Sequence, residues 1–463
     1  MTITPTDHAE AVTRAFRDGV TRPLDWRRAQ LRALRTLLRE NGQEIEAAVG
    51  ADLGKPGVEA LVTEISVVVS EIADALKHLD RWAAPRKGGV PALIRPARAN
   101  LVPEPLGTVL IIAPWNYPLQ LLLAPLVAAL AAGNAAVLKP SELAPHTSAV
   151  MARLIPRYLD TRAVKVVEGA VAETTELLTY PWDHIFYTGN GAVGRIVLEA
   201  AAKHLTPVTL ELGGKSPVYV DETADVDAVA SWLAWGKFLN AGQTCVAPDY
   251  LLAPQTVVDA LVPALEKAVQ RLYGEDPHLS PDYGRIVNDR HLARITDLIG
   301  SASGRIAIGG ISDAKDRYIA PTVITGASLE DAVMREEIFG PVLPVVNVDD
   351  RDEAVQIIND RDKPLALYVF STDEETHRIF TGETSSGGLV VNALVLHLSA
   401  GELPFGGVGA SGMGAYHGEE GFRTFSHTKS VLTKPAKAPS LPFSLALPPF
   451  TAAKSRVLRT LLR

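Results

Sequence analysis

The chain has 463 residues, which is too long for one simple core and predicts two or three packed units. Its residues are 47% hydrophobic and 21% charged, a composition that is typical of globular proteins and excludes a disordered or fibrous chain. The formal net charge of -8 disfavours binding to a phosphate backbone, so nucleic acid is not expected as a partner.

The single cysteine, Cys245, excludes an internal disulfide and a cysteine-rich metal site, and it suits a reducing compartment. The N-terminal segment is polar and shows no secretory signal. The longest apolar stretch, 119–133, is interrupted by Gln120 and Pro125 and is too short to span a bilayer. We therefore expect a cytoplasmic protein without an integral membrane anchor. The 11 histidines form no His-x-x-x-His pair, so no metal is expected.

The predicted elements begin with two amphipathic helices, over 26–49 and 62–82. Glycines and prolines over 87–105 indicate an extended excursion. Strands and helices then alternate, with strands predicted at 107–113, 135–139, 163–167, 184–188, 208–212 and 217–220 and helices at 119–133, 147–158, 193–205 and 226–239. This alternation predicts a mostly parallel sheet covered by helices on both faces. A second alternating series after Cys245 predicts a second lobe, with a site in the cleft between the two.

The segment from 437 to 463 differs from the rest, because it is rich in Pro, Leu and Phe and carries only basic charges. Such a segment could associate weakly with a membrane surface. It could also fold over a partner subunit or over the mouth of the site. Its short length and its three prolines, Pro442, Pro448 and Pro449, favour the second interpretation.

Cys245 is the first candidate for catalysis. It ends the stretch Asn-Ala-Gly-Gln-Thr-Cys at 240–245, in which Gly242 indicates an irregular loop and a close backbone approach. A thiol attacks only as the thiolate, so its surroundings would have to lower its pKa from about 8.5. The alternative is a lone buried cysteine that serves as a small hydrophobic residue.

Glu211 is the second candidate. Strand alternation places Leu210 and Leu212 on one face and Glu211 on the other, near the end of an apolar strand. A carboxylate there is costly unless it has a partner or a role, and the ends of parallel strands border a ligand crevice. A partly desolvated glutamate has a raised pKa and can act as a general base for water. The alternative is a salt bridge to Lys215.

Asn116 is the third candidate, in a rigid turn bracketed by Pro114 and Pro118 after an apolar strand. An amide on such a turn could donate a hydrogen bond to a developing oxyanion, a contribution worth about 10²–10³ in rate. The alternative is a simple turn in which the Asn side chain bonds to its own backbone.

Three further segments are typical of nucleotide binding, although each has a structural alternative. Gly-Asn-Gly-Ala-Val-Gly at 189–194 suits a phosphate at a helix N-terminus, or only a tight turn. Lys139 and Glu142 follow a strand and could hold a ribose, or form a solvated helix cap. Glu-Glu-Ile-Phe-Gly-Pro at 336–341 could hold a sugar and a ring, or form an exposed helix end.

Together and in this order, the motifs resemble the aldehyde dehydrogenase superfamily along essentially the whole chain. The matching stretches are Pro-Trp-Asn-Tyr-Pro at 114–118, Lys-Pro-Ser-Glu at 139–142, Glu-Leu-Gly-Gly-Lys-Ser-Pro at 211–217, Gly-Gln-Thr-Cys at 242–245, Glu-Glu-Ile-Phe-Gly-Pro at 336–341 and Pro-Phe-Gly-Gly at 404–407. The spacing from Glu211 to Cys245 is also that of the family. The stretch 403–427 resembles the short, usually dimeric class 3-like subgroup, which includes fatty and aromatic aldehyde dehydrogenases.

The resemblance implies NAD(P)-dependent oxidation of an aldehyde to a carboxylic acid. Cys245 would form a thiohemiacetal whose oxyanion is held by the Asn116 amide and the Cys245 backbone N–H. Loss of hydride to the nicotinamide would leave a thioester, which water activated by Glu211 would hydrolyse. By the same resemblance, the cofactor residues are Trp115, Lys139, Glu142, Gly189, Asn190, Gly194, Leu212, Glu337 and Phe339, and the substrate-pocket residues are Tyr117, Thr244 and Phe405.

The implied fold is α/β, with two Rossmann-like doubly wound lobes and a small oligomerisation β-flap. The expected domains are 1–85 with 107–212 for NAD(P) binding and 213–423 for catalysis. Segments 86–106 and 424–436 would form the oligomerisation flap, and 437–463 the C-terminal tail. A homodimer is expected on the same resemblance.

Two departures from the family pattern are Asn190, where many relatives carry Ser or Thr, and Ala410, where an Asn is common in the short class. Glu142 should repel a 2′-phosphate and favour NAD, although short-class enzymes with this Glu often accept NADP as well. The competing hypotheses are a cofactor-independent thiol esterase that uses Cys245 and Glu211, and a former enzyme retained as a binding protein.

Overall fold

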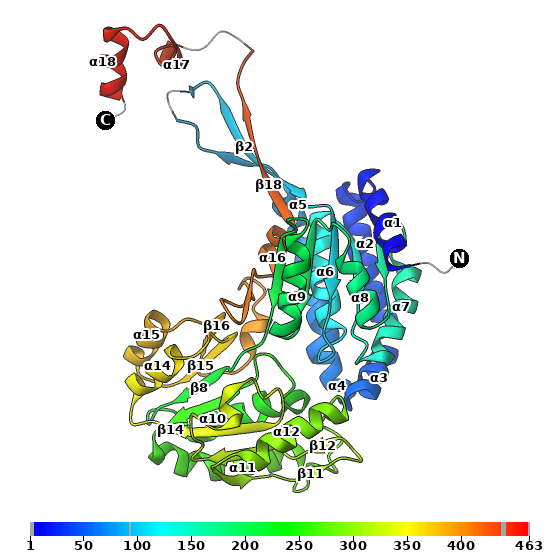
Figure 1. The fold of residues 1–463 in the computed structure, drawn as a ribbon, viewed down its shortest axis with the longest axis vertical. Helices are drawn as coiled ribbons and strands as arrows, with labels where there is room; N and C mark the ends of the chain where they lie inside the picture. The colour runs from blue at the N-terminus through cyan, green and yellow to red at the C-terminus, as the bar shows by residue number, and fades with distance from the viewer. Residues whose placement is uncertain (1–3, 92–93, 437–440, 462–463) are drawn as a thin grey trace.

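The alternation of strands and helices produces two sheets, each forming one lobe of the molecule (Figure 1). The computed structural model describes residues 4–91, 94–436 and 441–461. All strand pairs inside the two sheets are parallel except one at an edge of each. The predicted α/β class with mostly parallel sheets is therefore confirmed.

The first lobe is built on a six-stranded sheet with the order β17-β7-β6-β3-β4-β5. Its strands are β3 (Thr108–Ile112), β4 (Ala135–Lys139), β5 (Val164–Val166), β6 (His184–Thr188), β7 (Val208–Glu211) and the antiparallel edge strand β17 (Gly412–Met413). From β3 the chain moves through β4 to β5 on one side, and then returns to β6 and β7 on the other. This reversal makes the crevice outside the carboxyl ends of β3 and β6 the expected ligand site.

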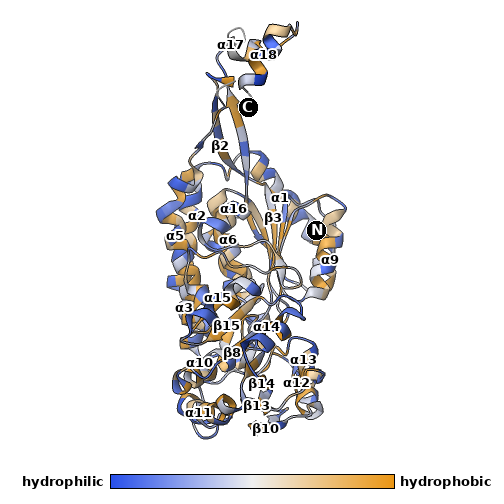
Figure 2. Ribbon diagram, turned by 90° about the vertical axis from the view of Figure 1, so that its left-hand side faces the viewer, coloured by the Kyte–Doolittle hydropathy of each residue, from blue (hydrophilic) through white to orange (hydrophobic). Residues whose placement is uncertain are grey.

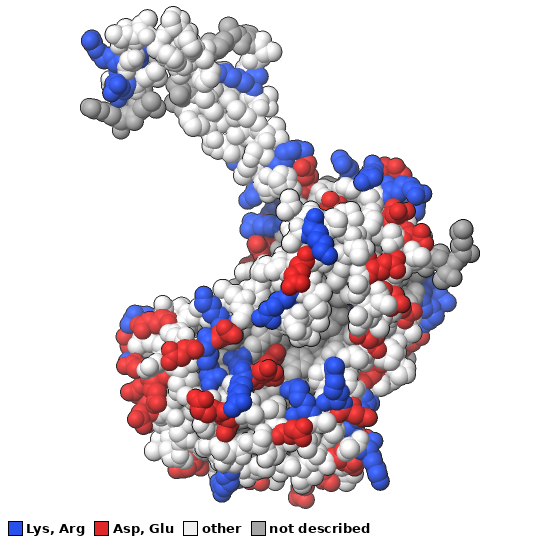
Figure 3. Space-filling model, viewed as in Figure 1, with Lys and Arg blue, Asp and Glu red and all other residues white. Residues whose placement is uncertain are grey.

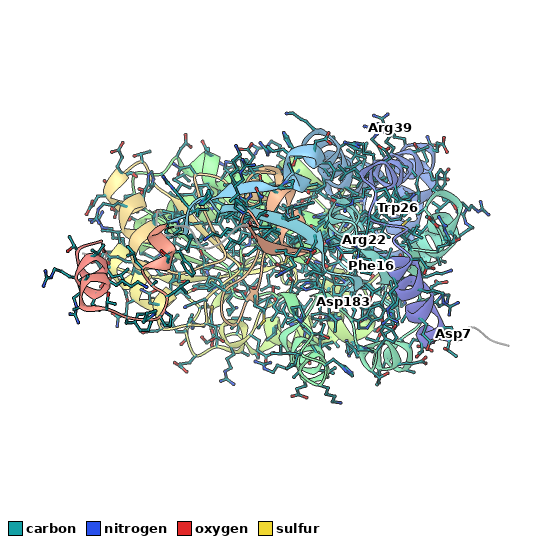
Figure 4. The ribbon with its side chains drawn as sticks, turned by 90° about the horizontal axis from the view of Figure 1, so that it is seen from above. Asp7, Phe16, Arg22, Trp26, Arg39 and Asp183 are labelled. Carbon is teal, nitrogen blue, oxygen red and sulfur yellow. The ribbon has the colours of Figure 1, made fainter. Side chains whose placement is uncertain are left out.

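Helices cover both faces of this sheet. They are α1 (Pro5–Arg17), α2 (Leu24–Glu40), α3 (Gly42–Leu53), α5 (Ser66–Ala83), α6 (Gln120–Ala132), α7 (Pro145–Tyr158), α8 (Val171–Leu178), α9 (Gly191–Ala202) and α16 (Gly418–Thr424). Arg22, in the loop between α1 and α2, places its guanidinium over the ring of Phe16, 5.7 Å from the ring centroid. Both residues are labelled in Figure 4. α6 is buried along its whole length, as its uniformly apolar sequence requires.

Two of the predicted helices have different boundaries in the structure. The helix predicted over 26–49 is interrupted at Asn41, whose side-chain amide donates to the carbonyl of Leu37 (2.8 Å) and to the hydroxyl of Tyr158 (3.0 Å). An Asn side chain competes in this way with helix continuation. The helix predicted over 62–82 begins earlier, because α4 (Gly57–Ala60) and the π-helical turn η1 (Leu61–Ile65) run directly into α5.

The second lobe contains a seven-stranded sheet with the order β10-β13-β14-β9-β8-β15-β16. Its strands are β8 (Pro217–Val220), β9 (Tyr250–Ala253), β10 (Arg305–Ile308), β13 (Thr322–Thr325), β14 (Val342–Asn347), β15 (Ala366–Phe370) and β16 (Gly388–Val391). Its helices and short elements are α10 (Val226–Phe238), η3 (Leu239–Gly242), α11 (Gln255–Tyr273), α12 (Asp289–Ser301), β11 (Ser312–Asp313), β12 (Tyr318–Ile319), α13 (Ala332–Arg335), α14 (Arg351–Asn359), α15 (Glu374–Glu383) and η4 (Leu396–Ser399). The predicted second alternating series is confirmed.

A narrow antiparallel arm projects from the first lobe (Figure 1). It consists of β1 (Arg86–Gly88), β2 (Arg98–Pro105) and β18 (Ser426–Thr433), in the order β1-β2-β18. The extended excursion predicted over 87–105 is therefore confirmed. Of the predicted tail, 437–440 and 462–463 lie outside the described residues, and the rest forms α17 (Leu441–Ser444) and α18 (Ala452–Leu461) near the tip of the arm.

Apolar residues concentrate in the strands and on the inward faces of the helices, as the hydropathy colours of Figure 2 show. Acidic and basic side chains are mixed over the two lobes on the face seen in Figure 3, which is indented where the lobes meet. Among the described residues, every helix is too short or too polar to cross a bilayer.

Candidate active site

The candidate residues gather where the two lobes meet. Asn116 follows β3, and Gly189 follows β6, so both lie at the carboxyl ends of the two strands between which the strand order reverses. Glu211 is the last residue of β7, beside β6. Cys245 enters from the second lobe, on the loop between η3 and β9. The topology thus brings together residues that are up to 129 positions apart in the chain (116 and 245).

The loop that carries Cys245 has an unusual backbone. Asn240, Ala241 and Gly242 all have positive φ, at 52°, 52° and 72°. A β-carbon on Gly242 would lie only 2.3 Å from the carbonyl oxygen of Gly340, so glycine is required there. The close backbone approach predicted at Gly242 is confirmed, and it joins the cysteine loop to the 336–341 segment.

Cys245 is half-buried, and its sulfur is a free thiol. Burial, followed by the charges of Glu337 and Glu211, raises the pKa of Cys245 to about 12, while the backbone N–H groups of Cys245 and Val246 act in the opposite direction. The described protein groups therefore do not by themselves lower the pKa of Cys245, as attack by the thiolate would require. The same two charges show that both carboxylates lie within electrostatic reach of the sulfur.

Glu211 is almost fully buried, with 2% of its surface exposed. Among the described residues neither carboxylate oxygen has a hydrogen-bond partner. Burial alone raises the pKa of Glu211 well above its ordinary value. The alternative of a salt bridge to Lys215 is wrong, because Lys215 bonds instead to the Asp249 carboxylate and to the carbonyl of Val333. A desolvated, unpaired carboxylate beside a thiol is suited to accept a proton from water.

The Asn116 turn is bonded directly to the cysteine loop. The Asn116 side-chain amide donates to the carbonyl of Gln243 over 3.1 Å, and the hydroxyls of Tyr117 and Thr244 are 2.7 Å apart. All four residues are buried. An amide nitrogen carries two donors, so one N–H of Asn116 remains after the bond to Gln243. The alternative of a local Asx turn does not describe this side chain, because its bond spans 127 positions.

Glu337 approaches the same site from the 336–341 segment. A β-carbon on Gly213 would lie 2.0 Å from Oε2 of Glu337, so the Gly213–Gly214 pair leaves room for this carboxylate. Burial, followed by the charge of Asp249, raises the pKa of Glu337 to about 8, whereas the Gly214 N–H, Lys215 and Lys237 lower it. Lys237 itself is fully buried, and its ammonium has no hydrogen-bond partner in the described part of the chain.

Trp115 and Phe339, two of the predicted cofactor residues, form an edge-to-face pair with ring centroids 5.3 Å apart. Both are half-buried, and Phe339 has a positive φ of 49°. Trp115 also contacts the ring of His291 at 5.3 Å. The structure therefore brings the turn after β3 and the 336–341 segment to one aromatic wall.

The turn from β6 to α9 has the shape predicted for a phosphate-binding segment. Asn190 caps α9, with its side chain accepting from the N–H of Val193 (3.0 Å). A β-carbon on Gly194 would lie 3.1 Å from the Leu212 side chain, so the helix packs closely on the residue after β7. Thr188, just before Gly189, has a buried hydroxyl without a partner among the described residues.

Lys139 and Glu142 lie one strand further along, at the end of β4, where Lys139 pairs with Ile112 of β3. Lys139 is buried, Glu142 is exposed, and the charged groups are 3.9 Å apart. A dinucleotide offers hydroxyls and phosphates to bind. The groups available here are the donors of Lys139 and Thr188, the carboxylate of Glu142 and the N-terminus of α9, and together they match those hydroxyls and phosphates. These residues therefore fit NAD or NADP.

Aromatic side chains also cluster near Glu211 and Cys245. Phe405 contacts Tyr416 at 5.8 Å and His417 at 5.7 Å between ring centroids. Burial, followed by the charges of Glu211 and Cys245, raises the pKa of Tyr416, so Tyr416 lies close to both groups. Of these aromatic residues, only Phe405 was predicted from the sequence.

Several buried charged residues near the site were not identified from the sequence. Lys237 lies in the helix predicted over 226–239. Lys55 lies between the first two predicted helices and Glu64 within the second, and both precede Asn116 by more than 50 positions. Only the tertiary contacts reveal them, since no local spacing links them to the motifs. Within the described ranges, there is no group of three or more His, Cys, Asp or Glu residues that could hold a metal ion.

Comparisons with known proteins agree with this geometry. A sequence model described as "Aldehyde dehydrogenase family" matches residues 5–431. The chain is 49% identical over 440 residues to aldehyde dehydrogenase family 3 member A2 of Mus musculus, covering 95% of this chain and 90% of that protein. It is 49% identical over 428 residues to "Aldehyde dehydrogenase, dimeric NADP-preferring" of Rattus norvegicus, covering 92% and 94%. The solved structure of substrate-bound AldH from Staphylococcus aureus is similar with a TM-score of 0.96 and 43% identity, covering 100% of both chains.

Proposed function

The chain belongs to the aldehyde dehydrogenase family, and from that premise we propose that Cys245, Glu211 and Asn116 carry out its NAD(P)-dependent oxidation of an aldehyde to a carboxylic acid. The observation that supports this assignment best is the meeting of a free thiol and an unpaired, buried carboxylate at the junction of the lobes. The bond from Asn116 to the cysteine loop adds the third group.

In the first step, the Cys245 sulfur gives up its proton to solvent water and forms a bond to the aldehyde carbon. The carbonyl oxygen becomes an oxyanion, for which the free N–H of Asn116 and the backbone N–H of Cys245 are the donors. Asn116 is well suited to this task, since its other N–H and its position are fixed by the cysteine loop. Donors held in place before the reaction stabilise the charge without a reorganisation cost.

In the second step, the tetrahedral carbon loses a hydride and becomes a thioester on Cys245. When bound, the oxidised nicotinamide supplies the acceptor for this hydride, which carries two electrons. Trp115 and Phe339 would flank the ring, and Glu337 would hold the adjacent ribose. Gly189, Asn190, Gly194 and Leu212 would shape the pyrophosphate turn, and Lys139 and Glu142 would hold the adenosine ribose.

In the third step, Glu211 takes a proton from water and the resulting hydroxide attacks the thioester carbon. The carbon–sulfur bond breaks, the sulfur leaves as thiolate, and the carboxylic acid departs. Burial supports this role because it raises the proton affinity of the Glu211 carboxylate. Tyr117, Thr244 and Phe405 would line the passage by which the aldehyde reaches Cys245.

The domain roles follow from the same assignment. Segments 1–85 and 107–212 would bind the cofactor, and 213–423 would carry the catalytic cysteine. Segments 86–106 and 424–436 form the projecting arm, and we infer that this arm joins two subunits, since a relative is named as dimeric. The tail, 437–463, would cover the partner subunit or the mouth of the site. A cytoplasmic location is inferred from the lone reduced cysteine.

An acyl-enzyme experiment tests this function. Enzyme mixed with NAD and an aldehyde is quenched in acid and analysed by intact-protein mass spectrometry. The expected mass gain is that of the aldehyde less two hydrogens, located on the only cysteine, and it should require the cofactor. An acyl adduct that forms from an ester without NAD, but not from the aldehyde with NAD, would support the thiol esterase instead. The absence of any adduct on Cys245 would contradict the proposed nucleophile.

Cofactor preference depends on Glu142 in this assignment. Its exposed carboxylate should repel a 2′-phosphate, with an effect of about 1 kcal/mol at contact distance in water. Glu142→Gln is therefore expected to raise the ratio of kcat/KM with NADP to kcat/KM with NAD by about five-fold. Steady-state assays with both cofactors measure this ratio. Glu173→Gln serves as a control, because Glu173 is another acid whose charge acts on Lys139. An unchanged ratio in Glu142→Gln would show that Glu142 does not determine the cofactor preference.

A further inference from the structure

A fully buried ion pair lies behind the turn that carries Asn116. Nζ of Lys55 is 2.7 Å from Oε1 of Glu64, and both side chains have no exposed surface. Removing two charges from water is expensive, so a buried pair is weak evidence for added stability. Glu64 also lies in the π-helical turn η1, and such turns inside helices are frequent at functional sites.

Every donor of the Lys55 ammonium has an acceptor around it. Besides Glu64, Nζ donates to the backbone carbonyl of Asn116 over 3.2 Å. It also lies over the ring of Tyr117, 4.0 Å from the centroid. An ammonium has three N–H donors, so the carboxylate, the carbonyl and the ring face account for all of them. Two of these three partners belong to the Asn116 turn.

The second oxygen of Glu64 holds the far end of the same turn. Oε2 accepts from the backbone N–H of Leu119 (2.8 Å) and of Gln120 (3.4 Å). These groups stand at the start of α6, where backbone N–H groups have no partner within the helix, and Leu119 provides no side-chain cap. A carboxylate at this position is favoured by the helix dipole. The ion pair therefore holds the turn at both ends.

Asn240 completes the support from the cysteine loop. Its side-chain amide donates to the Asn116 carbonyl over 2.8 Å and to the Gln243 carbonyl over 3.2 Å. The Asn116 carbonyl thus accepts two bonds, from Lys55 and Asn240, and the carbonyl of Gln243 receives the Asn116 side chain itself. With these bonds in place, the direction of the remaining Asn116 N–H is fixed relative to Cys245.

We propose that Lys55 and Glu64 are positioning residues that aim the Asn116 amide at the oxyanion. The proposal rests on the proposed function, because it requires Asn116 to be the oxyanion donor. Neither residue touches the reacting atoms, and both act through the backbone of 116–120. A donor that shifts by about 1 Å can lose about 10²-fold in rate, so a small relaxation of this turn is sufficient to slow the reaction.

The test is a double-mutant cycle on kcat/KM for an aldehyde. Lys55→Met combined with Glu64→Gln removes both charges of the pair, so neither partner is left as a buried ion without the other. In the enzyme with Asn116 intact, this change is expected to lower kcat/KM by about 10- to 100-fold, with KM for NAD unchanged. In an Asn116→Ala background the same change is expected to lower kcat/KM by less than about three-fold, since the group it positions is already gone.

Asp52→Asn is the matched control. Asp52 is also buried and lies three positions before Lys55, but its carboxylate accepts from Thr147 at the start of α7 rather than from the Asn116 turn. Its kcat/KM is expected to stay close to that of the unmodified enzyme. Glu64→Asp alone, which keeps both charges but shortens the side chain that reaches Leu119, serves if the combined variant does not fold. It should show a smaller loss in the same direction, and only when Asn116 is present.

An equal loss in both backgrounds would overturn the proposal, because the pair would then act on something other than Asn116. No loss in the intact background would overturn it as well. Failure of the proposed function has a different signature, in which Asn116→Ala alone retains full kcat/KM.

Discussion

Cys245→Ala is expected to abolish aldehyde oxidation, with kcat/KM reduced by at least about 10⁴-fold. The chain contains no other cysteine, so no neighbouring thiol can replace the lost sulfur. Without a nucleophile there is no thiohemiacetal, and the hydride has no tetrahedral carbon from which to leave. The measurement is the growth of reduced-nicotinamide absorbance with a panel of aldehydes of increasing chain length.

The same variant should still bind NAD, because the proposed cofactor residues lie on other segments. Cys245 is half-buried, and an alanine there removes one atom without introducing a charge, so the fold should be retained. Cofactor titration and thermal unfolding provide these controls. Cys245→Ser is a useful comparison, since its hydroxyl has nearly the same shape as the thiol but is a much weaker acid. Oxidation at the normal rate in Cys245→Ala would contradict the assignment of the nucleophile.

Much of this site could be predicted because several motifs directly follow predicted parallel strands, and the topology then determines where they lie. Alternating strands and helices predicted parallel sheets, and residues after such strands share one edge. Asn116 follows β3, and Gly189 follows β6, so the sequence was sufficient to place both at that edge. Gly242 could be interpreted too, since a glycine just before the cysteine indicated a close backbone approach, which Gly340 makes.

Tertiary contacts decided the features that could not be predicted. A salt bridge between Glu211 and Lys215 was a reasonable alternative from four positions of separation, but Asp249, from another strand connection, takes Lys215 instead. Sequence proximity carries no information about such competition. The isolation of Glu211, which gives it a raised proton affinity, follows only from the packing around β7.

The sequence could not show how the protein would affect the ionisation of Cys245. Attack as a thiolate requires a lowered pKa, whereas the packed junction desolvates the thiol and places two acids nearby. Burial also raises the pKa values of Glu211 and Glu337, the latter to about 8. Burial therefore favours the neutral form of both acids, and a neutral acid repels a thiolate less than a carboxylate does.

Glu211→Gln is expected to stop the reaction after the first turnover. The variant should release one equivalent of reduced cofactor per site in a burst, and its steady-state kcat should then be lower by about 10²–10⁴-fold. Glutamine keeps the size of the side chain but cannot take a proton from water. Acylation does not use Glu211, so the thioester forms and persists. Rapid-quench mass spectrometry should show Cys245 nearly fully acylated in the variant.

The pH dependence identifies the group responsible. Only the carboxylate form of Glu211 can act as the base, and burial raises its pKa, so the unmodified enzyme should lose deacylation rate as pH falls through that raised value and reach a plateau above it. In Glu211→Gln this dependence should disappear, leaving only the shallow rise that comes from hydroxide in solution. If the variant turned over at the normal steady rate, or kept the same pH profile, the base would have to be another residue. Glu337, which also lies near Cys245, would then be the next residue to replace.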